Sequence, residues 1–230
     1  MDMFFYDPTI IILIPALLIA MYAQYKVKNT FKKYSEVGSN SNKTAAEIAQ
    51  ELLFKNDIND IKVKRIKGNL NDHYDPKNKL LNLSEEIYGS KSVAAIGIAA
   101  HEAGHAIQDA QGYTLLKIRA KIVPAASIGS SWGLPLAIIG FFLQSQTMIA
   151  LGFIMFLGAL IFHLITLPVE FDASNKALTL LKRNNILNND ELKGATKVLR
   201  AAAFTYVSAT LIALVNLVRI VLLFGMGRND

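Results

Sequence analysis

Residues 99–106 read AAHEAGHA, and this stretch determines how the rest of the chain is interpreted. His101 and His105 are four positions apart, so in a helix both imidazoles lie on one face, where they can bind a single zinc ion. Glu102 lies beside them, and its carboxylate can take a proton from a water molecule that a zinc ion has made acidic. The stretch therefore predicts a zinc site with Glu102 as the general base.

The alternative is that the two histidines only pack on a buried helix. The chain has only four histidines, so a chance H-E-x-x-H pattern is rare. Imidazoles and a carboxylate in so apolar a helix would also be costly without a partner. The chain contains no cysteine, so any metal ligands must be His, Asp or Glu. These points favour the zinc interpretation.

The apolar residues indicate a membrane protein. Hydrophobic residues make up 52% of the 230 residues, and the mean hydropathy is +0.32. They cluster in four stretches, each long enough for a bilayer-crossing helix, which takes about 20 residues. The composition therefore predicts a mostly α-helical membrane protein with four transmembrane helices. These helices are expected at residues 9–25, 122–143, 147–167 and 206–224.

The net charge of +6 does not indicate nucleic-acid binding, because no nucleic-acid recognition motif accompanies the basic residues. The positions of the basic residues instead indicate how the chain is oriented in a membrane. Segment 26–121 holds sixteen of the 24 Lys and Arg residues, and segment 168–205 holds six. Basic segments between transmembrane helices stay in the cytoplasm. The charge pattern thus predicts a multi-pass protein of the cell membrane, surrounded by the lipid bilayer, with both segments cytoplasmic and both termini outside.

Segment 26–121 is predicted to form a zincin-like α+β metallopeptidase domain with a small β-sheet, and segment 168–205 to be helical. The capping box of Thr44 and Glu47 opens one helix, and alternating apolar residues predict two short strands. The expected elements are a helix at 44–54, a strand at 61–66, a turn at 71–78, a strand at 79–83, the motif helix from Ser90 or Ser92 to about Gly112, and a long helix from Asn188 or Asn189. The strand at 79–83 precedes the motif helix, where it could present an edge to an extended peptide or be purely structural.

A catalytic zinc ion usually has three protein ligands, and a water molecule takes the fourth position. Glu170, in the stretch LPVEFDAS at 167–174, is the best third ligand, because it would lie on the same side of the membrane as His101. Asp172 competes with it for this role. Glu170 could also be a solvated carboxylate near a helix N-terminus. The residues alone leave this choice open.

Other side chains are candidates for supporting roles. His73 could stabilise the oxyanion of the transition state, although a histidine in a turn is the more common case. Tyr206 and Tyr74 are further candidates for oxyanion donors. Asp172 could act next to a ligand instead of as one.

Three segments resemble the YugP-like family of membrane neutral zinc metallopeptidases: DHYDP at 72–76, HEAGHAIQ at 101–108 and PVEFDAS at 168–174. The likeness covers nearly the whole chain. More distantly, the chain is similar to HtpX and the CAAX-processing enzymes, which pair H-E-x-x-H with a later E-F-x-A-D. The Glu of that second motif is the third zinc ligand, so the resemblance implies this role for Glu170. Ser174 stands where those relatives have Asp, so the role of that Asp does not transfer directly.

We therefore expect a membrane-embedded zinc endopeptidase with one Zn²⁺ per chain. It would hydrolyse peptides or membrane proteins at the cytoplasmic face, with no nucleic-acid partner, and the sequence indicates no particular oligomeric state. The alternative is a non-catalytic zinc-binding membrane adaptor or structural protein. Glu102 separates the two hypotheses, because a structural zinc site needs no general base.

Overall fold

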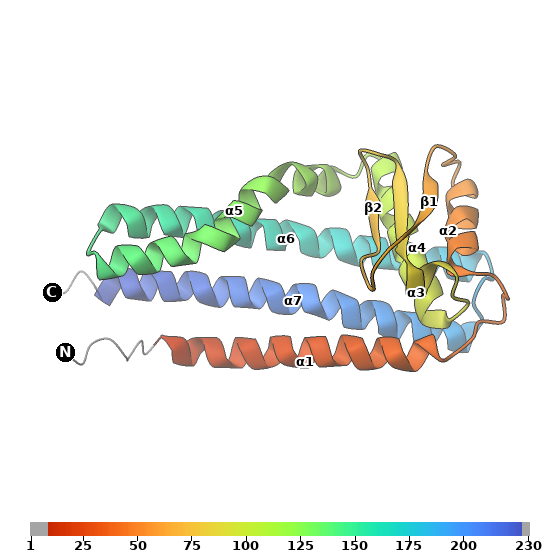
Figure 1. Ribbon diagram of the computed structural model, residues 1–230, viewed down its shortest axis with the longest axis horizontal. Coiled ribbons are helices and arrows are strands. Elements are labelled where there is room, and N and C mark those ends of the chain that lie inside the picture. The colour runs from red at the N-terminus through yellow and green to blue at the C-terminus, as the bar shows by residue number, and fades with distance from the viewer. Residues whose placement is uncertain (1–8, 227–230) are drawn as a thin grey trace. The chain divides into compact units, whose positions relative to one another are not determined.

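A computed structural model describes the backbone of residues 9–226 and the side chains of residues 9–222. These residues form seven α-helices and one three-stranded sheet (Figure 1). In chain order the elements are α1 (Ile10–Ser35), α2 (Ala45–Phe54), β1 (Lys62–Ile66), β2 (His73–Asp75), β3 (Leu80–Ser84), α3 (Glu85–Tyr88), α4 (Val93–Ala110), α5 (Thr114–Phe142), α6 (Gln146–Arg183) and α7 (Asn189–Met226).

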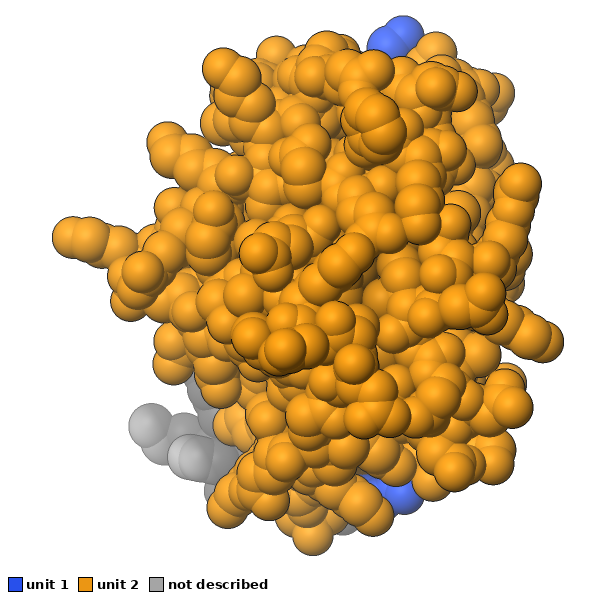
Figure 2. Space-filling model, turned by 90° about the vertical axis from the view of Figure 1, so that its right-hand side faces the viewer, with its two compact units in different colours: residues 1–24, 118–167, 205–230 blue, residues 25–117, 168–204 orange. Residues whose placement is uncertain are grey.

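The chain divides into two compact units, which Figure 2 distinguishes by colour. Unit 1 comprises residues 1–24, 118–167 and 205–230, and unit 2 comprises residues 25–117 and 168–204. Helices α1, α5, α6 and α7 contribute residues to both units, whereas α2, α3, α4 and the sheet belong to unit 2 alone.

Four helices, α1, α5, α6 and α7, are long and apolar enough to cross a membrane, as the sequence predicted. The helices extend beyond the apolar stretches that revealed them. For example, α1 continues to Ser35, and α6 continues through Pro168 to Arg183. The added residues are largely polar or basic, and several of these residue types have high helix propensity. Hydropathy marks the apolar part of such a helix and not its ends.

Within unit 1, α5 and α6 approach closely through glycines. A Cβ atom at Gly129 would lie 2.3 Å from the carbonyl oxygen of Met155, and one at Gly152 would lie 2.5 Å from that of Gly133. Small residues allow backbones to touch in this way, which is how helices associate where lipid replaces water. The linker between the two helices is short, with Gln144 at φ +52°, so α5 and α6 form a tight helical hairpin.

The sheet of unit 2 has the order β1-β3-β2, with β1 parallel and β2 antiparallel to β3. Helices α2, α3 and α4 pack against it (Figure 1). The prediction that residues 79–83 could offer an edge is wrong, because β3 is the central strand and both its sides are paired. Large apolar side chains with almost no exposure fill this core: Ile48, Leu52, Leu53, Leu81, Leu83, Ile87 and Ile96.

Strand β2 corrects a second expectation, since its residues were predicted to lie in a turn. His73 pairs with Asn82 and Asp75 with Leu80. The sequence His-Tyr-Asp has no alternation of apolar residues that would predict a strand. Pairing with β3, a tertiary contact, determines its conformation.

Local signals set the helix ends as expected. Thr44 accepts a hydrogen bond from the backbone of Glu47 and donates its own backbone N–H to the Glu47 carboxylate, which completes the predicted capping box at α2. Ser92 caps α4 by accepting from the backbone of Ala95. Gly112, at φ +70°, follows the last turn of α4 in the left-handed conformation that ends many helices.

Helices α4 and α6 touch at their backbones inside unit 2. A Cβ atom at Gly104 would lie 2.6 Å from the carbonyl oxygen of Ala173. Any residue larger than glycine would therefore force the two helices apart. Glu170 lies almost one turn before Ala173 on α6, so this contact also sets how close Glu170 comes to α4.

The substitution Gly104→Ala tests this contact. We expect it to destabilise the protein by about 1–3 kcal/mol, because the added methyl group meets backbone atoms that cannot rotate away. Thermal unfolding in detergent, followed by circular dichroism, measures the change. Gly158→Ala is the control, since a Cβ there meets no atom within 4 Å. Equal unfolding temperatures for the two variants would contradict the importance of this contact.

Candidate metal centre

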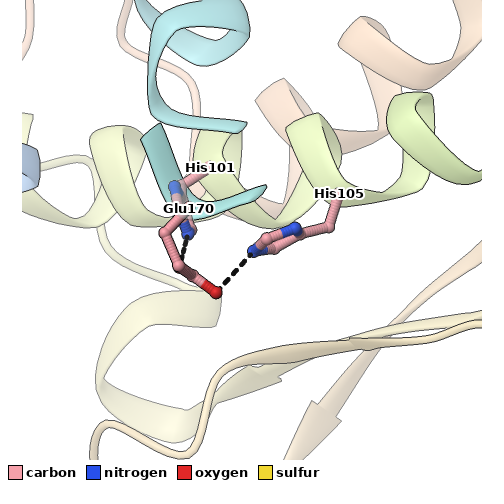
Figure 3. A group of neighbouring side chains, drawn as sticks. All are labelled: His101, His105 and Glu170. Carbon is pink, nitrogen blue, oxygen red and sulfur yellow. Dashed lines mark hydrogen bonds and ion pairs between the residues drawn. The ribbon is translucent and has the colours of Figure 1, made fainter. Parts of the chain in front are cut away.

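Three side chains of unit 2 form the candidate metal centre (Figure 3). His101 and His105 project from α4, and Glu170 projects from α6. One potential ligand atom from each lies within 4.8 Å of the others. The Nε2 atom of His101 is 3.2 Å from Oε2 of Glu170, and Nε2 of His105 is 3.7 Å from Oε1. The helical spacing of the histidines and the approach of α6 together bring the three groups to one point.

The donor set fits a zinc ion. Zinc bonds of about 2.0–2.1 Å in a tetrahedral arrangement place ligand atoms roughly 3.3 Å apart, close to the two distances observed. Two imidazole nitrogens and one carboxylate oxygen are ligands that zinc prefers, and a fourth position would remain for water. Within the part of the chain that the structure describes, this group has three members. A set of three is typical of catalytic zinc sites, whereas structural sites have four protein ligands.

Electrostatics favour a positive charge at this point. His105 is buried, and burial by itself would lower the pKa of its imidazole. Hydrogen bonding and charge from Glu170, together with the charge of Glu102, outweigh burial and raise the pKa of His105 above its usual value. The two carboxylates thus create a negative potential, which suits a bound cation.

Glu102 lies next to this group but outside it. Its carboxylate is almost fully buried, and its Oε2 atom accepts a hydrogen bond of 3.0 Å from the backbone N–H of Tyr74 in β2. This bond holds one oxygen of the carboxylate in place. Sequence reasoning missed this contact, because it depends on the strand that the sequence did not predict.

The side chain of Tyr74 attaches β2 to α4 a second time. Its hydroxyl donates to Asp109 at 2.9 Å, and Lys79 donates to the same carboxylate oxygen at 2.9 Å. Burial and the Asp109 carboxylate raise the pKa of Tyr74 above its usual value. Burial would also raise the pKa of Asp109, but hydrogen bonds from Lys79 and Tyr74 outweigh it and lower that pKa. At neutral pH the phenol is therefore protonated and the carboxylate charged, which strengthens the bond between them.

Ser174 and Asp172 have different positions around the centre. The Oγ atom of Ser174 is 3.1 Å from Nδ1 of His101, so this serine itself contacts the first histidine. Asp172 accepts instead from Gln108 and from Lys176. The side chain beside His101 is thus a neutral hydroxyl and not a carboxylate.

The oxyanion-stabilising role of the two remaining candidates, His73 and Tyr206, stays a prediction. His73 is exposed in β2, and its ring nitrogens face the Asn71 carbonyl at 2.8 Å and the Asn82 amide at 3.1 Å. Asn71 lies two residues before His73 in the chain, and Asn82 lies opposite His73 on β3. Tyr206 lies on α7 in unit 1.

The chain matches the family described as "Putative neutral zinc metallopeptidase" over residues 9–225. The protein belongs to this family. It is also 42% identical over 221 residues to a protein of Bacillus subtilis (strain 168) described as "Putative membrane protease YugP". That alignment covers 96% of this chain and 98% of the relative. No solved structure matches the chain. The resemblance inferred from the three sequence segments is therefore confirmed.

Because the protein belongs to a zinc metallopeptidase family, an experiment can ask whether Glu170 or Asp172 is the third zinc ligand. We expect Glu170→Gln to lose most bound zinc, because a neutral amide is a poor zinc ligand. Asp172→Asn should lower zinc affinity by no more than about 10–100-fold, as is typical of residues outside the ligand set. Chelator competition on the purified protein measures both affinities. The reverse order would show that Asp172 is the ligand.

Proposed function

We propose that the protein is a membrane-embedded zinc endopeptidase that hydrolyses peptide bonds at the cytoplasmic face. One observation supports this most directly: a buried carboxylate, Glu102, stands beside a three-ligand centre without belonging to it. The family and the membrane-protease description of the relative support the same activity. Its substrates would be peptides or membrane proteins.

In this proposal His101, His105 and Glu170 hold one Zn²⁺ per chain. When bound, the ion supplies a Lewis acid that polarises the scissile carbonyl and lowers the pKa of a water molecule to about 7. Glu102 would be the general base that takes a proton from the attacking water and the general acid that returns it to the leaving amine. The Tyr74 backbone N–H keeps the Glu102 carboxylate oriented before substrate arrives, so little reorganisation is needed.

The alternative, a zinc-binding adaptor or structural protein, is less consistent with the site. A structural zinc ion is closed off by four protein ligands and needs no acid or base beside it. A buried carboxylate next to the ion would serve no purpose there and would cost desolvation energy. Proteolysis is therefore the function that the site supports best.

Replacing the general base tests the proposal. Glu102→Gln should lower the rate of casein cleavage by about 10²–10⁴-fold, because the amide cannot accept the proton, while zinc content stays near one per chain. Glu86→Gln is the matched control, since Glu86 is exposed on α3. Cleavage by Glu102→Gln at the rate of the control would overturn the proposed mechanism.

The cytoplasmic location of unit 2 is also a proposal, supported by the charge of its segments. The chain has no cysteine, so single cysteines can report the topology directly. We expect a membrane-impermeant maleimide to label Gln146→Cys in intact cells and Asn69→Cys only after permeabilisation. Both positions are exposed, in the α5–α6 linker region and in the β1–β2 loop. Labelling of Asn69→Cys in intact cells would contradict this orientation.

A further inference from the structure

Gln108 is a fully buried polar side chain on α4, three residues after His105. Its Nε2 atom lies 2.8 Å from the carbonyl oxygen of Val169 and 2.8 Å from Oδ2 of Asp172, both on α6. Its Oε1 atom lies 3.0 Å from Nδ1 of His105. One amide group therefore contacts both helices that form the metal centre.

These partners determine the orientation of the amide. A backbone carbonyl can only accept a hydrogen bond, and the Asp172 carboxylate, which already accepts from Lys176, also accepts. The amide must therefore direct its NH₂ group, with two hydrogens, towards Val169 and Asp172. Its oxygen is then left for His105.

The orientation of the amide in turn determines the tautomer of His105. An amide oxygen can only accept, so Nδ1 of His105 must have the hydrogen. The other nitrogen, Nε2, then presents its lone pair. Figure 3 shows that this nitrogen points to Glu170, while Nδ1 is turned away. The lone pair thus faces the point where a metal ion would bind.

The same amide also positions Glu170. Val169 and Asp172 flank Glu170 on α6, so the two hydrogen bonds from Gln108 hold the turn that presents this carboxylate. His101 has no equivalent, because the Ser174 hydroxyl beside it can donate or accept and so does not select a tautomer.

We infer that Gln108 is a positioning residue of the metal centre, which selects the Nδ1–H tautomer of His105 and holds the Glu170 turn of α6 against α4. This inference rests on the proposed zinc site. It adds that two of the three ligands are aligned by a single buried amide.

Variants of Gln108 separate its two roles. Gln108→Met keeps the approximate size and removes every hydrogen bond. Gln108→Glu can still accept from His105 but places a second carboxylate against Asp172. In the double variant Gln108→Glu/Asp172→Asn, the new amide can donate to the new carboxylate, which restores the link to residue 172 but not the hydrogen bond to the Val169 carbonyl. Gln111→Met, on an exposed residue at the end of α4, is the matched control.

Two measurements that do not depend on proteolysis test the inference. The first is zinc affinity by chelator competition, and the second is the visible absorption spectrum of the Co²⁺-substituted protein, which reports ligand geometry. We expect Gln108→Met and Gln108→Glu to lose about 10–100-fold in affinity, the usual effect of removing a partner of a metal ligand. The Co²⁺ absorption spectra of these two variants should also differ from that of the unsubstituted protein. The double variant should recover part of the loss shown by Gln108→Glu, and Gln111→Met should match the unsubstituted protein.

Several outcomes would overturn the inference. One is a Gln108→Met protein with unchanged affinity and an unchanged Co²⁺ spectrum. Another is a double variant no better than Gln108→Glu. If the single variants do not fold, ¹⁵N spectra of the histidine-labelled, unsubstituted protein decide, because a His105 ring with a proton on Nε2 and none on Nδ1 would contradict the assigned tautomer. Failure of the proposed function can be told apart from failure of this inference. In the first case the unsubstituted protein itself would bind no zinc or cleave no substrate.

Discussion

The backbone contact between α4 and α6 is the constraint on which the candidate site depends. Helices usually pack with their axes about 8–10 Å apart, and a glycine at the contact allows the near end of that range. At Gly104 the carbonyl of Ala173 occupies the space that a side chain would need. This approach brings Glu170 to hydrogen-bonding distance of His101, although 69 positions separate them in the chain. A looser contact would leave two histidines on a helix and no third ligand.

Several buried polar groups around this contact form hydrogen bonds with one another, as is usual for buried groups. The amide of Gln108 connects His105 to α6, and the hydroxyl of Ser174 contacts His101. On the other side of α4, strand β2 supplies a backbone N–H to Glu102. The small sheet therefore does more than complete a core, because one of its strands also holds the Glu102 carboxylate. His101 and Glu102 thus have partners on other elements, whereas His105 has a partner on its own helix that is itself hydrogen-bonded to α6.

The two compact units meet different physical demands. Unit 1 is built from long apolar helices in which glycines allow close packing, and large side chains such as Trp132 are exposed on its surface, as suits contact with lipid. Unit 2 has an apolar core of its own between the sheet and its helices. The family match over residues 9–225 includes residues of both units, so the four long apolar helices and the H-E-x-x-H stretch fall within a single family match.

The sequence by itself determined those features that depend on interactions between residues close together in the chain. The spacing of His101 and His105 on one helix face, the four apolar helices and the caps at Thr44 and Ser92 depend on neighbours only a few residues away. What the tertiary structure alone decided involves distant segments: strand β2, the central place of β3, and the contacts of Tyr74, Gln108 and Ser174. Helix and strand periodicity report which face of an element is buried, but not which element covers that face. The orientation of the site was therefore determined only by the packing of α6 and β2 against α4.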